Sequence, residues 1–278
     1  MLMLSQMQKN RKFVNLIEKF FPYRSKLAKV TKIPILKSIV KKMLFDKTNL
    51  TILPKDKVVE INLNKKVPVP ESIVLPSKIV EYFVKKSNYR FIMNFCICRE
   101  SMDCKNYPKD LGCLFLGEAA KHINKEFGYE ATKEDALKHV GKCRELGLVH
   151  LVGRDVIDEQ WLGVSPGEKL MVVCNCCECC CLWRILPDMD KDMGLVVKKM
   201  PGVEVKVTDK CTGCGKCKDI CFVKAINIED GVAKISSECR GCGRCVEICP
   251  NQAIELKINN KDFIEKTIKR INSSVDVT

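Results

Sequence analysis

A cysteine pattern that occurs twice near the C-terminus constrains this chain more than any other feature. Each copy reads C-x-x-C-x-x-C-x-x-x-C; the copies begin at Cys211 and Cys239 and end at Cys221 and Cys249. Three thiols at this spacing, followed by a fourth, favour an iron–sulfur cluster. Two zinc ribbons are the alternative, but zinc sites commonly use two separated C-x-x-C pairs.

Residues 201–258 resemble the ferredoxin family that binds two [4Fe–4S] clusters, since this spacing is the one that family uses. The resemblance implies that the fourth cysteine of each copy reaches the other cluster. The expected ligands are Cys211, Cys214, Cys217 and Cys249 for one cluster, and Cys239, Cys242, Cys245 and Cys221 for the other. One departure from the pattern is Phe222, which stands where the second copy has Pro250.

The cluster loops have their own local signals. Glycines at 213, 215, 241 and 243 permit positive φ and a close approach of the backbone to a cluster. Short strands are predicted around the loops, at residues 203–207, 225–228 and 253–256. Lys216 and Arg244 lie inside the loops, and we expect both to be solvated.

Composition sets the wider frame. The chain has 278 residues, 46% of them hydrophobic, which is enough for two modest domains. Its 19 cysteines come without a recognisable leader and without an apolar run long enough to span a membrane. We therefore expect reduced thiolates that hold metal in the cytoplasm of an anaerobic host, with a peripheral location at the membrane as an open alternative.

The net charge of +14 is concentrated at the N-terminus, where residues 1–66 hold 16 Lys and Arg against 4 Asp and Glu. Residues 11–45 mix these lysines with apolar residues at helical spacing. Three interpretations stay open: helices packed on the rest of the protein, contact with an anionic membrane surface, or a nucleic-acid arm. Nucleic acid is the least favoured, because only 6% of residues are aromatic and no binding module is recognisable.

The order of the helices and strands expected along the rest of the chain predicts an α+β fold. Residues 50–76 are expected to be extended connecting chain, Ser77 to cap a helix, and residues 89–97 to form a strand. A helix over 133–146 and a strand over 148–152 follow, an order also found at the end of winged-helix units. The predicted domains are a basic segment and linker (1–70), a cysteine-rich mixed module (71–200), the ferredoxin domain (201–258) and a C-terminal tail (259–278).

The cysteine-rich module holds eleven further cysteines. We expect its two cysteine-bearing segments, 96–113 and 174–181, to converge on one further iron–sulfur site. The alternatives are a zinc site, or structural and redox-active thiols. The candidate ligands are Cys96, Cys98, Cys104, Cys113, Cys174, Cys176, Cys177, Cys179 and Cys180. Cys143 is expected to be a buried apolar residue. The strings around these cysteines resemble the upstream portion of ferredoxin-domain proteins in anaerobic prokaryotes, a resemblance that implies no particular reaction.

These patterns favour an electron-transfer protein that has two [4Fe–4S] clusters and a further metal site and that serves redox partner proteins. The alternative is a cluster-dependent reductase whose active site lies in residues 90–185. For that alternative the sequence identifies no catalytic residue, and Glu178, inside the cysteine run, is the first carboxylate to test. Phosphate-binding and dinucleotide-binding motifs are absent from the sequence.

Overall fold

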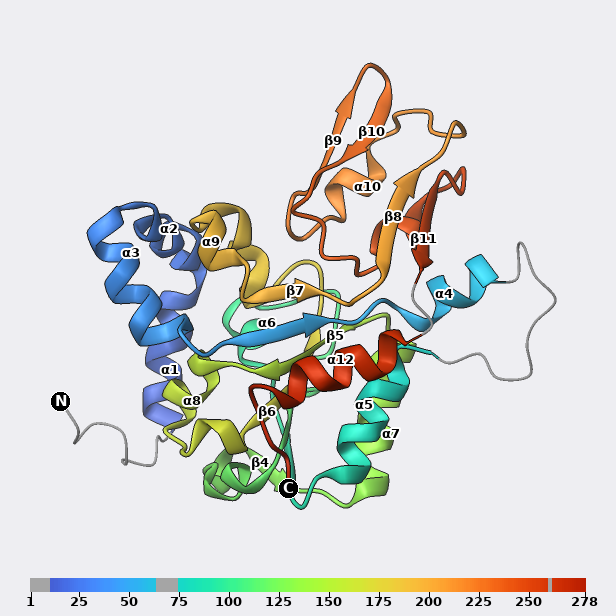
Figure 1. Ribbon diagram of the computed structural model, residues 1–278. Coiled ribbons are helices and arrows are strands. Elements are labelled where there is room, and N and C mark those ends of the chain that lie inside the picture. The colour runs from blue at the N-terminus through green and yellow to red at the C-terminus, as the bar shows by residue number, and fades with distance from the viewer. Residues whose placement is uncertain (1–10, 64–74, 260–261) are drawn as a thin grey trace.

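A seven-stranded sheet forms the centre of the computed structural model, which describes residues 11–63, 75–259 and 262–278 (Figure 1). The strand order is β4-β2-β3-β6-β5-β1-β7, and every pairing is antiparallel except that between β1 and β7. The strands are β1 (Asn49–Ile52), β2 (Arg90–Met93), β3 (Leu114–Leu116), β4 (Gly128–Glu130), β5 (Val149–Arg154), β6 (Met171–Cys176) and β7 (Val197–Lys199).

Both faces of this sheet are covered, because alternate residues of its strands enter two different apolar cores. On β5 and β6, Leu151 and Val172 belong to one core, whereas Val152 and Val173 belong to the other. The second core is covered by α4 (Asp56–Leu63), α5 (Ser77–Lys86), α7 (Lys133–Glu145) and α12 (Phe263–Asn272).

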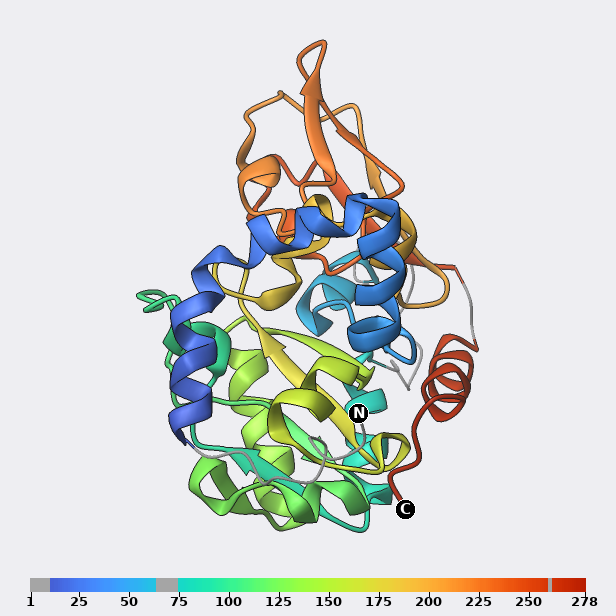
Figure 2. The ribbon, with the colours of Figure 1, turned by 90° about the vertical axis from the view of Figure 1, so that its left-hand side faces the viewer.

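The first core lies under six other helices among the described residues. They are α1 (Arg11–Phe20), α2 (Arg24–Lys29), α3 (Pro34–Val40), α6 (Ile97–Ser101), α8 (Val156–Leu162) and α9 (Lys191–Gly194). The 3-10 turns are η1 (Phe21–Tyr23), η2 (Val30–Lys32), η4 (Glu118–His122), η5 (Lys125–Phe127), η6 (Gly167–Lys169) and η7 (Leu182–Asp188), and η3 (Lys41–Phe45) is a π-helix. Figure 2 shows the N-terminal helices, in blue, lying across this side of the molecule.

The C-terminal domain stands at one end of the sheet and has its own small core (Figure 1). It consists of two antiparallel strand pairs and two short helices. The strands are β8 (Val203–Val207) with β11 (Ile254–Ile258) and β9 (Ile226–Glu229) with β10 (Val232–Ile235), and the helices are α10 (Lys216–Asp219) and α11 (Arg244–Ile248). The three strands predicted around the cluster loops are thus confirmed to within two residues.

Several other local predictions are confirmed. Helix α7 begins after Thr132, whose hydroxyl and the Asp135 carboxylate form a capping box, and β5 follows as expected. Strand β5 lies between β1 and β6 in the large sheet, so the winged-helix interpretation of this order is wrong. The prediction that Ser77 caps a helix is wrong by one position, because Ser77 is the first residue of α5 and Pro76 occupies the cap position without a side-chain cap hydrogen bond.

Two segments that the sequence placed outside the main fold contribute to its core. Residues 50–76 were expected to be extended, but β1 inserts between β5 and β7 and α4 is helical; residues 64–74 lie outside the described part. Val58 of α4 is fully buried, which explains why this stretch folds against the sheet. In the predicted tail, Ile271, Val275 and Val277 are buried in the second core. Within the described residues, no helix combines the length and the apolar character needed to cross a bilayer.

Candidate metal centres

Four of the predicted cluster cysteines meet at the outer part of the C-terminal domain. Cys211, Cys214, Cys217 and Cys249, three from the first copy and one from the second, line one small pocket. The amide of Ala233 donates to Cys211 Sγ and the amide of Ala253 to Cys249 Sγ, each at 3.3 Å. Amide-to-sulfur hydrogen bonds of this kind stabilise thiolates. Cys214 is exposed, so this group is open to solvent.

The other four gather on the inner side of the domain. Burial raises the pKa of Cys221, and the neighbouring thiolates of Cys242 and Cys239 raise it further. Cys245 follows the same pattern, since burial and then the charges of Cys242 and Cys239 raise its pKa. The Ala225 amide donates to Cys221 Sγ at 3.3 Å. The structure thus places the fourth cysteine of each copy with the first three of the other; that these thiols bind clusters stays a prediction.

Glycine is required in these loops for two separate reasons. Gly213 has φ 65°, and a Cβ there would stand 2.3 Å from the carbonyl oxygen of Gly231. Gly215 has φ 82°, with no atom within 4 Å of the position that a Cβ would take. The first glycine therefore permits both a left-handed conformation and a close approach, whereas the second supplies the conformation alone.

The two copies have unequal surroundings, because the inner one docks on the sheet. Phe222, which replaces the expected proline, is 2% exposed and belongs to the first core of the sheet. Cys221, Cys239 and Cys242 pack against the same core. The aromatic ring at 222 thus anchors the C-terminal domain to the cysteine-rich module, which accounts for the departure from the pattern.

The prediction that both loop cations are solvated is right for Lys216 and wrong for Arg244. Lys216 is exposed, but Arg244 is 4% exposed and lies under the domain. Its guanidinium donates to the Cys176 carbonyl oxygen at 2.5 Å, lies 3.8 Å from the Glu178 carboxylate and stands 5.5 Å from the centre of the Phe222 ring. Arg244 therefore links the inner cysteines to the cysteine run of the module.

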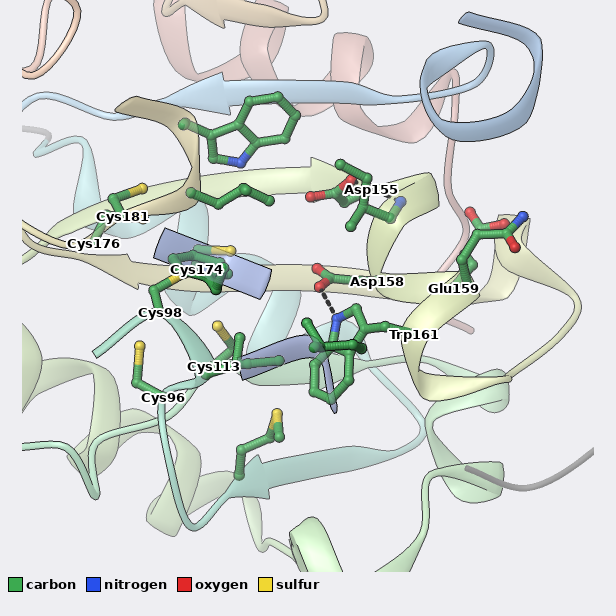
Figure 3. A pocket seen from close by; sticks show the side chains of 18 of the residues that line it. Cys96, Cys98, Cys113, Asp155, Asp158, Glu159, Trp161, Cys174, Cys176 and Cys181 are labelled. Atoms are coloured by element: carbon green, nitrogen blue, oxygen red, sulfur yellow. Dashed lines mark hydrogen bonds between the residues drawn. The ribbon is translucent and has the colours of Figure 1, made fainter. Parts of the chain in front are cut away.

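A cavity of about 600 Å³ lies beside this junction (Figure 3). Its sulfur-bearing wall comes from α6, the start of β3, the end of β6 and the start of η7. Seven cysteines line it: Cys96, Cys98, Cys113, Cys174, Cys176, Cys177 and Cys181. The volume is typical of sites for small molecules and cofactors.

The cavity thiols lie close enough to share protons. A hydrogen bond from Cys98 lowers the pKa of Cys96 to about 7 and raises that of Cys98. Hydrogen bonds from Cys174 and Cys181 hold the pKa of Cys176 well below its usual value. Thiols that stabilise one another's thiolates in this way are suited to holding a metal or a cluster.

Carboxylates occupy the opposite wall of the cavity, at the start of α8 (Figure 3). Asp155 caps this helix by accepting a hydrogen bond from the Ile157 amide at 3.1 Å, and burial raises its pKa. Asp158 accepts a hydrogen bond from the Trp161 indole at 2.8 Å. Burial raises the pKa of Asp158 to about 7. The site thus combines redox-active thiols with a carboxyl group able to hold a proton near neutral pH.

The N-terminal helices close the cavity. Phe13 and Ile17 of α1, Phe21 of η1 and Leu44 of η3 form part of its lining. Of the three interpretations of this basic segment, the structure confirms that it packs on the rest of the protein. Other apolar side chains of this segment, Leu16 and Phe20 among them, are exposed.

Arg99 organises the cysteine-bearing loops from within. Its side chain has 0% exposure and donates hydrogen bonds to the carbonyl oxygens of Pro108 and Asn175, each at 2.8 Å, and of Leu111. Burial lowers the pKa of this guanidinium, but the surrounding thiolates, Cys96 first, more than offset the effect and raise it. Arg99 thus keeps its charge and ties the loop after α6 to β6.

A second sulfur group lies next to the cavity. The Sγ atoms of Cys104, Cys177, Cys179 and Cys180 are all within 4.8 Å of one another. The nine predicted ligands of the module thus come together in space, but in two groups with Cys177 adjoining both. Cys181, absent from the prediction, lines the cavity, and its place in the run of adjacent cysteines was the available signal. Cys143 is fully buried in α7, as predicted.

Comparison with known proteins identifies one part of the chain. Residues 204–250 match the model of a family described as a 4Fe–4S dicluster domain. The C-terminal domain is therefore a ferredoxin-type iron–sulfur domain. Neither the curated proteins nor the solved structures contain a match to this chain.

Proposed function

We propose that this protein transfers electrons through two [4Fe–4S] clusters in its C-terminal domain and a further iron–sulfur site in the cavity. The observation that carries the proposal is the interleaving of the two cysteine copies in two groups of four. A [4Fe–4S] cluster exchanges one electron at a potential set by the hydrogen bonds, charge and burial that the protein supplies.

The burial of the cysteines gives the proposed route a direction. The outer group includes the exposed Cys214 and is accessible to a redox partner protein. The inner group packs on the core that contains Cys176, Cys181 and Trp183. The redox partner would therefore exchange electrons with the outer group, and the inner group would carry them between the outer group and the cavity.

The test is an anaerobic preparation of the full chain with iron and sulfide analysis. Two clusters require eight iron atoms, and reduction should produce the paramagnetic signal of reduced [4Fe–4S] centres. The Cys214→Ala variant should lose the outer signal, whereas Cys143→Ala, which removes a buried thiol of α7, should keep it. Absence of a reducible signal in the unaltered chain would refute the proposal.

The cavity supports a second candidate, a cluster-dependent reductase with its active site in residues 90–185. Thiols on one wall and Asp158 on the other would allow electrons and protons to reach one bound molecule. We assign the cavity ligands to Cys96, Cys98, Cys113, Cys174, Cys176 and Cys181, whose side chains line it.

Iron beyond eight atoms per chain tests the cavity cluster. It should disappear in Cys174→Ala and persist in Cys143→Ala. Carbon monoxide and cyanide then separate the two functions: a perturbed cavity signal indicates an open coordination position and favours the reductase, whereas an unchanged signal favours electron transfer alone. If the unaltered chain binds only eight iron atoms and the cavity thiols are reactive, the cavity holds a dithiol site and no cluster.

The N-terminal helices offer a docking surface for an anionic membrane. Nine of the fifteen exposed large hydrophobic side chains among the described residues lie in residues 11–45, and Ile35, at 77%, is the most exposed of them. Exposed lysines, including Lys41 and Lys42, stand among them. Apolar side chains surrounded by lysines match the acyl and headgroup layers of such a surface.

Sedimentation with vesicles tests this surface. The chain should bind vesicles that contain phosphatidylserine, and Ile35→Glu should weaken binding. Tyr129→Glu, at an exposed aromatic residue on β4, serves as the control and should leave binding intact. Equal binding to neutral phosphatidylcholine vesicles, or no binding to either, would rule the proposal out.

A further inference from the structure

The second sulfur group differs in kind from the cavity. Its members are Cys104, in the loop after α6, and Cys177, Cys179 and Cys180, in the turn after β6. These two segments are 75 residues apart along the chain. Neither segment is a helix or a strand at these positions, so ordinary backbone pairing does not hold the four thiols together.

The sulfur separations match the ligand shell of a single ion. Cys179 Sγ lies 3.7 Å from Cys104 Sγ and 3.5 Å from Cys180 Sγ. Four thiolates bound tetrahedrally at about 2.3 Å from zinc stand about 3.8 Å apart, since the edge of a tetrahedron is about 1.6 times its centre-to-corner distance. The ligands of a [4Fe–4S] cluster bind four separate iron atoms and must therefore stand farther apart than the ligands of one ion.

A backbone donor and a buried cation adjoin the group. The Cys180 amide donates to Cys177 Sγ at 3.3 Å. The buried Arg99 guanidinium interacts with the Cys177 thiolate and offsets part of the negative charge that four thiolates bring. Such amides and charges orient and tune metal-binding thiolates.

We propose that Cys104, Cys177, Cys179 and Cys180 bind one zinc ion in a closed structural site. Binding displaces four thiol protons to solvent, and four protein sulfurs complete the tetrahedron and leave no open position. The ion would fasten the loop after α6 to the turn after β6. The hydrogen bond from the Tyr107 hydroxyl to the Glu178 carboxylate, at 2.9 Å, joins the same two segments.

This inference goes beyond the proposed function and does not depend on electron transfer. The zinc ion gives the neighbouring cavity a fixed wall, because Cys176 and Cys181 flank the zinc-binding turn on either side. The proposal also assigns different roles to the two cysteine groups of the module: the zinc-binding group stabilises the fold, and the other group faces the cavity.

The experiment measures zinc and iron separately in the full chain purified anaerobically. Zinc should be present at one ion per chain, fall to a small fraction of that in Cys179→Ala, and persist in Cys143→Ala. Cys143 is the matched control, because it belongs to the same apolar cluster as Cys104, Cys177 and Cys180 but lies outside the group of four. The reduced iron signal of the C-terminal domain reports whether each variant is folded.

Spectroscopy of the unaltered chain makes the test independent of any variant. Cobalt exchanged for the zinc should give the visible bands of a tetrahedral thiolate complex, and zinc X-ray absorption should show four sulfurs at about 2.3 Å. Substoichiometric zinc, oxygen or nitrogen ligands, or loss of iron instead of zinc in Cys179→Ala would overturn the proposal. Failure of the electron-transfer proposal alone would instead remove the iron signal and leave zinc in place.

Discussion

Replacement of Arg244 by methionine should lower the reduction potential of the inner cluster. Arg244 lies between the proposed ligands Cys242 and Cys245 in the chain and is buried, and the Cys242 thiolate is the leading charge that raises the pKa of Arg244 against the cost of burial. A nearby cation favours the reduced cluster, because reduction adds negative charge. Its removal therefore makes the potential more negative.

The size of the shift follows from burial. For a charge ~7 Å from the cluster and an effective dielectric constant of ~20, Coulomb's law gives about 2.4 kcal/mol. At ~59 mV per 1.4 kcal/mol for one electron, this equals about 100 mV. Lys216 has the corresponding position in the first copy but is exposed, and a water-like dielectric constant of ~80 reduces the same interaction to about 0.6 kcal/mol, or about 25 mV.

The assay is a redox titration of the full chain followed by electron paramagnetic resonance. Arg244→Met should move the inner potential by about 100 mV and Lys216→Met should move the outer potential by about 25 mV or less. Arg244→Lys retains the charge and should therefore keep the inner potential close to that of the unaltered chain. Equal shifts in the two methionine variants, or no shift in Arg244→Met, would refute the claim that burial of this charge tunes the inner site.

Two further predictions concern folding. Gly213→Ala should destabilise the C-terminal domain and reduce its iron content much more than Gly215→Ala, because only the first places its Cβ against a backbone oxygen, while both incur about 1–2 kcal/mol for a left-handed conformation. Iron analysis and thermal unfolding measure the difference, and equal losses would show that the close approach at Gly231 is unimportant. Asp158→Asn should raise the thermal midpoint relative to the unaltered chain at pH 8 and change it less at pH 4. The folded pKa of Asp158, about 7, exceeds its usual value of 3.8, so the contribution of Asp158 to stability is fully present below pH 4 and is lost as the pH rises to about 7. A variant that gains nothing at pH 8 would contradict this sign.

The sequence predicted the parts of the fold that depend on local chemistry. The Thr132 capping box and the strands beside the cluster loops follow from residues that are neighbours in the chain. These two predictions succeeded because local backbone geometry determines both features. The grouping of the cluster cysteines followed instead from the resemblance of residues 201–258 to two-cluster ferredoxins, which implies that the fourth cysteine of each copy joins the other copy.

Features that depend on packing between distant segments could not be predicted. Arg244 and Lys216 occupy equivalent positions in the repeat, and only the docking of Phe222 on the sheet decides which of them is buried. The division of the module's cysteines into two groups depends on the crossing of the 96–113 and 174–181 segments. Adjacent cysteines such as Cys180 and Cys181 point into different groups, which spacing alone does not reveal.

The placement of β1 has a practical consequence for anyone who divides this protein into pieces. Because β1 fills an interior position in the sheet and the helices before it seal the cavity, a fragment that starts at the cysteine-rich module would lose a strand and expose its sulfurs to water. An isolated C-terminal fragment would likewise uncover Phe222 and the inner thiols. Biochemistry on excised segments would therefore examine unprotected sulfur chemistry that the intact polypeptide keeps enclosed.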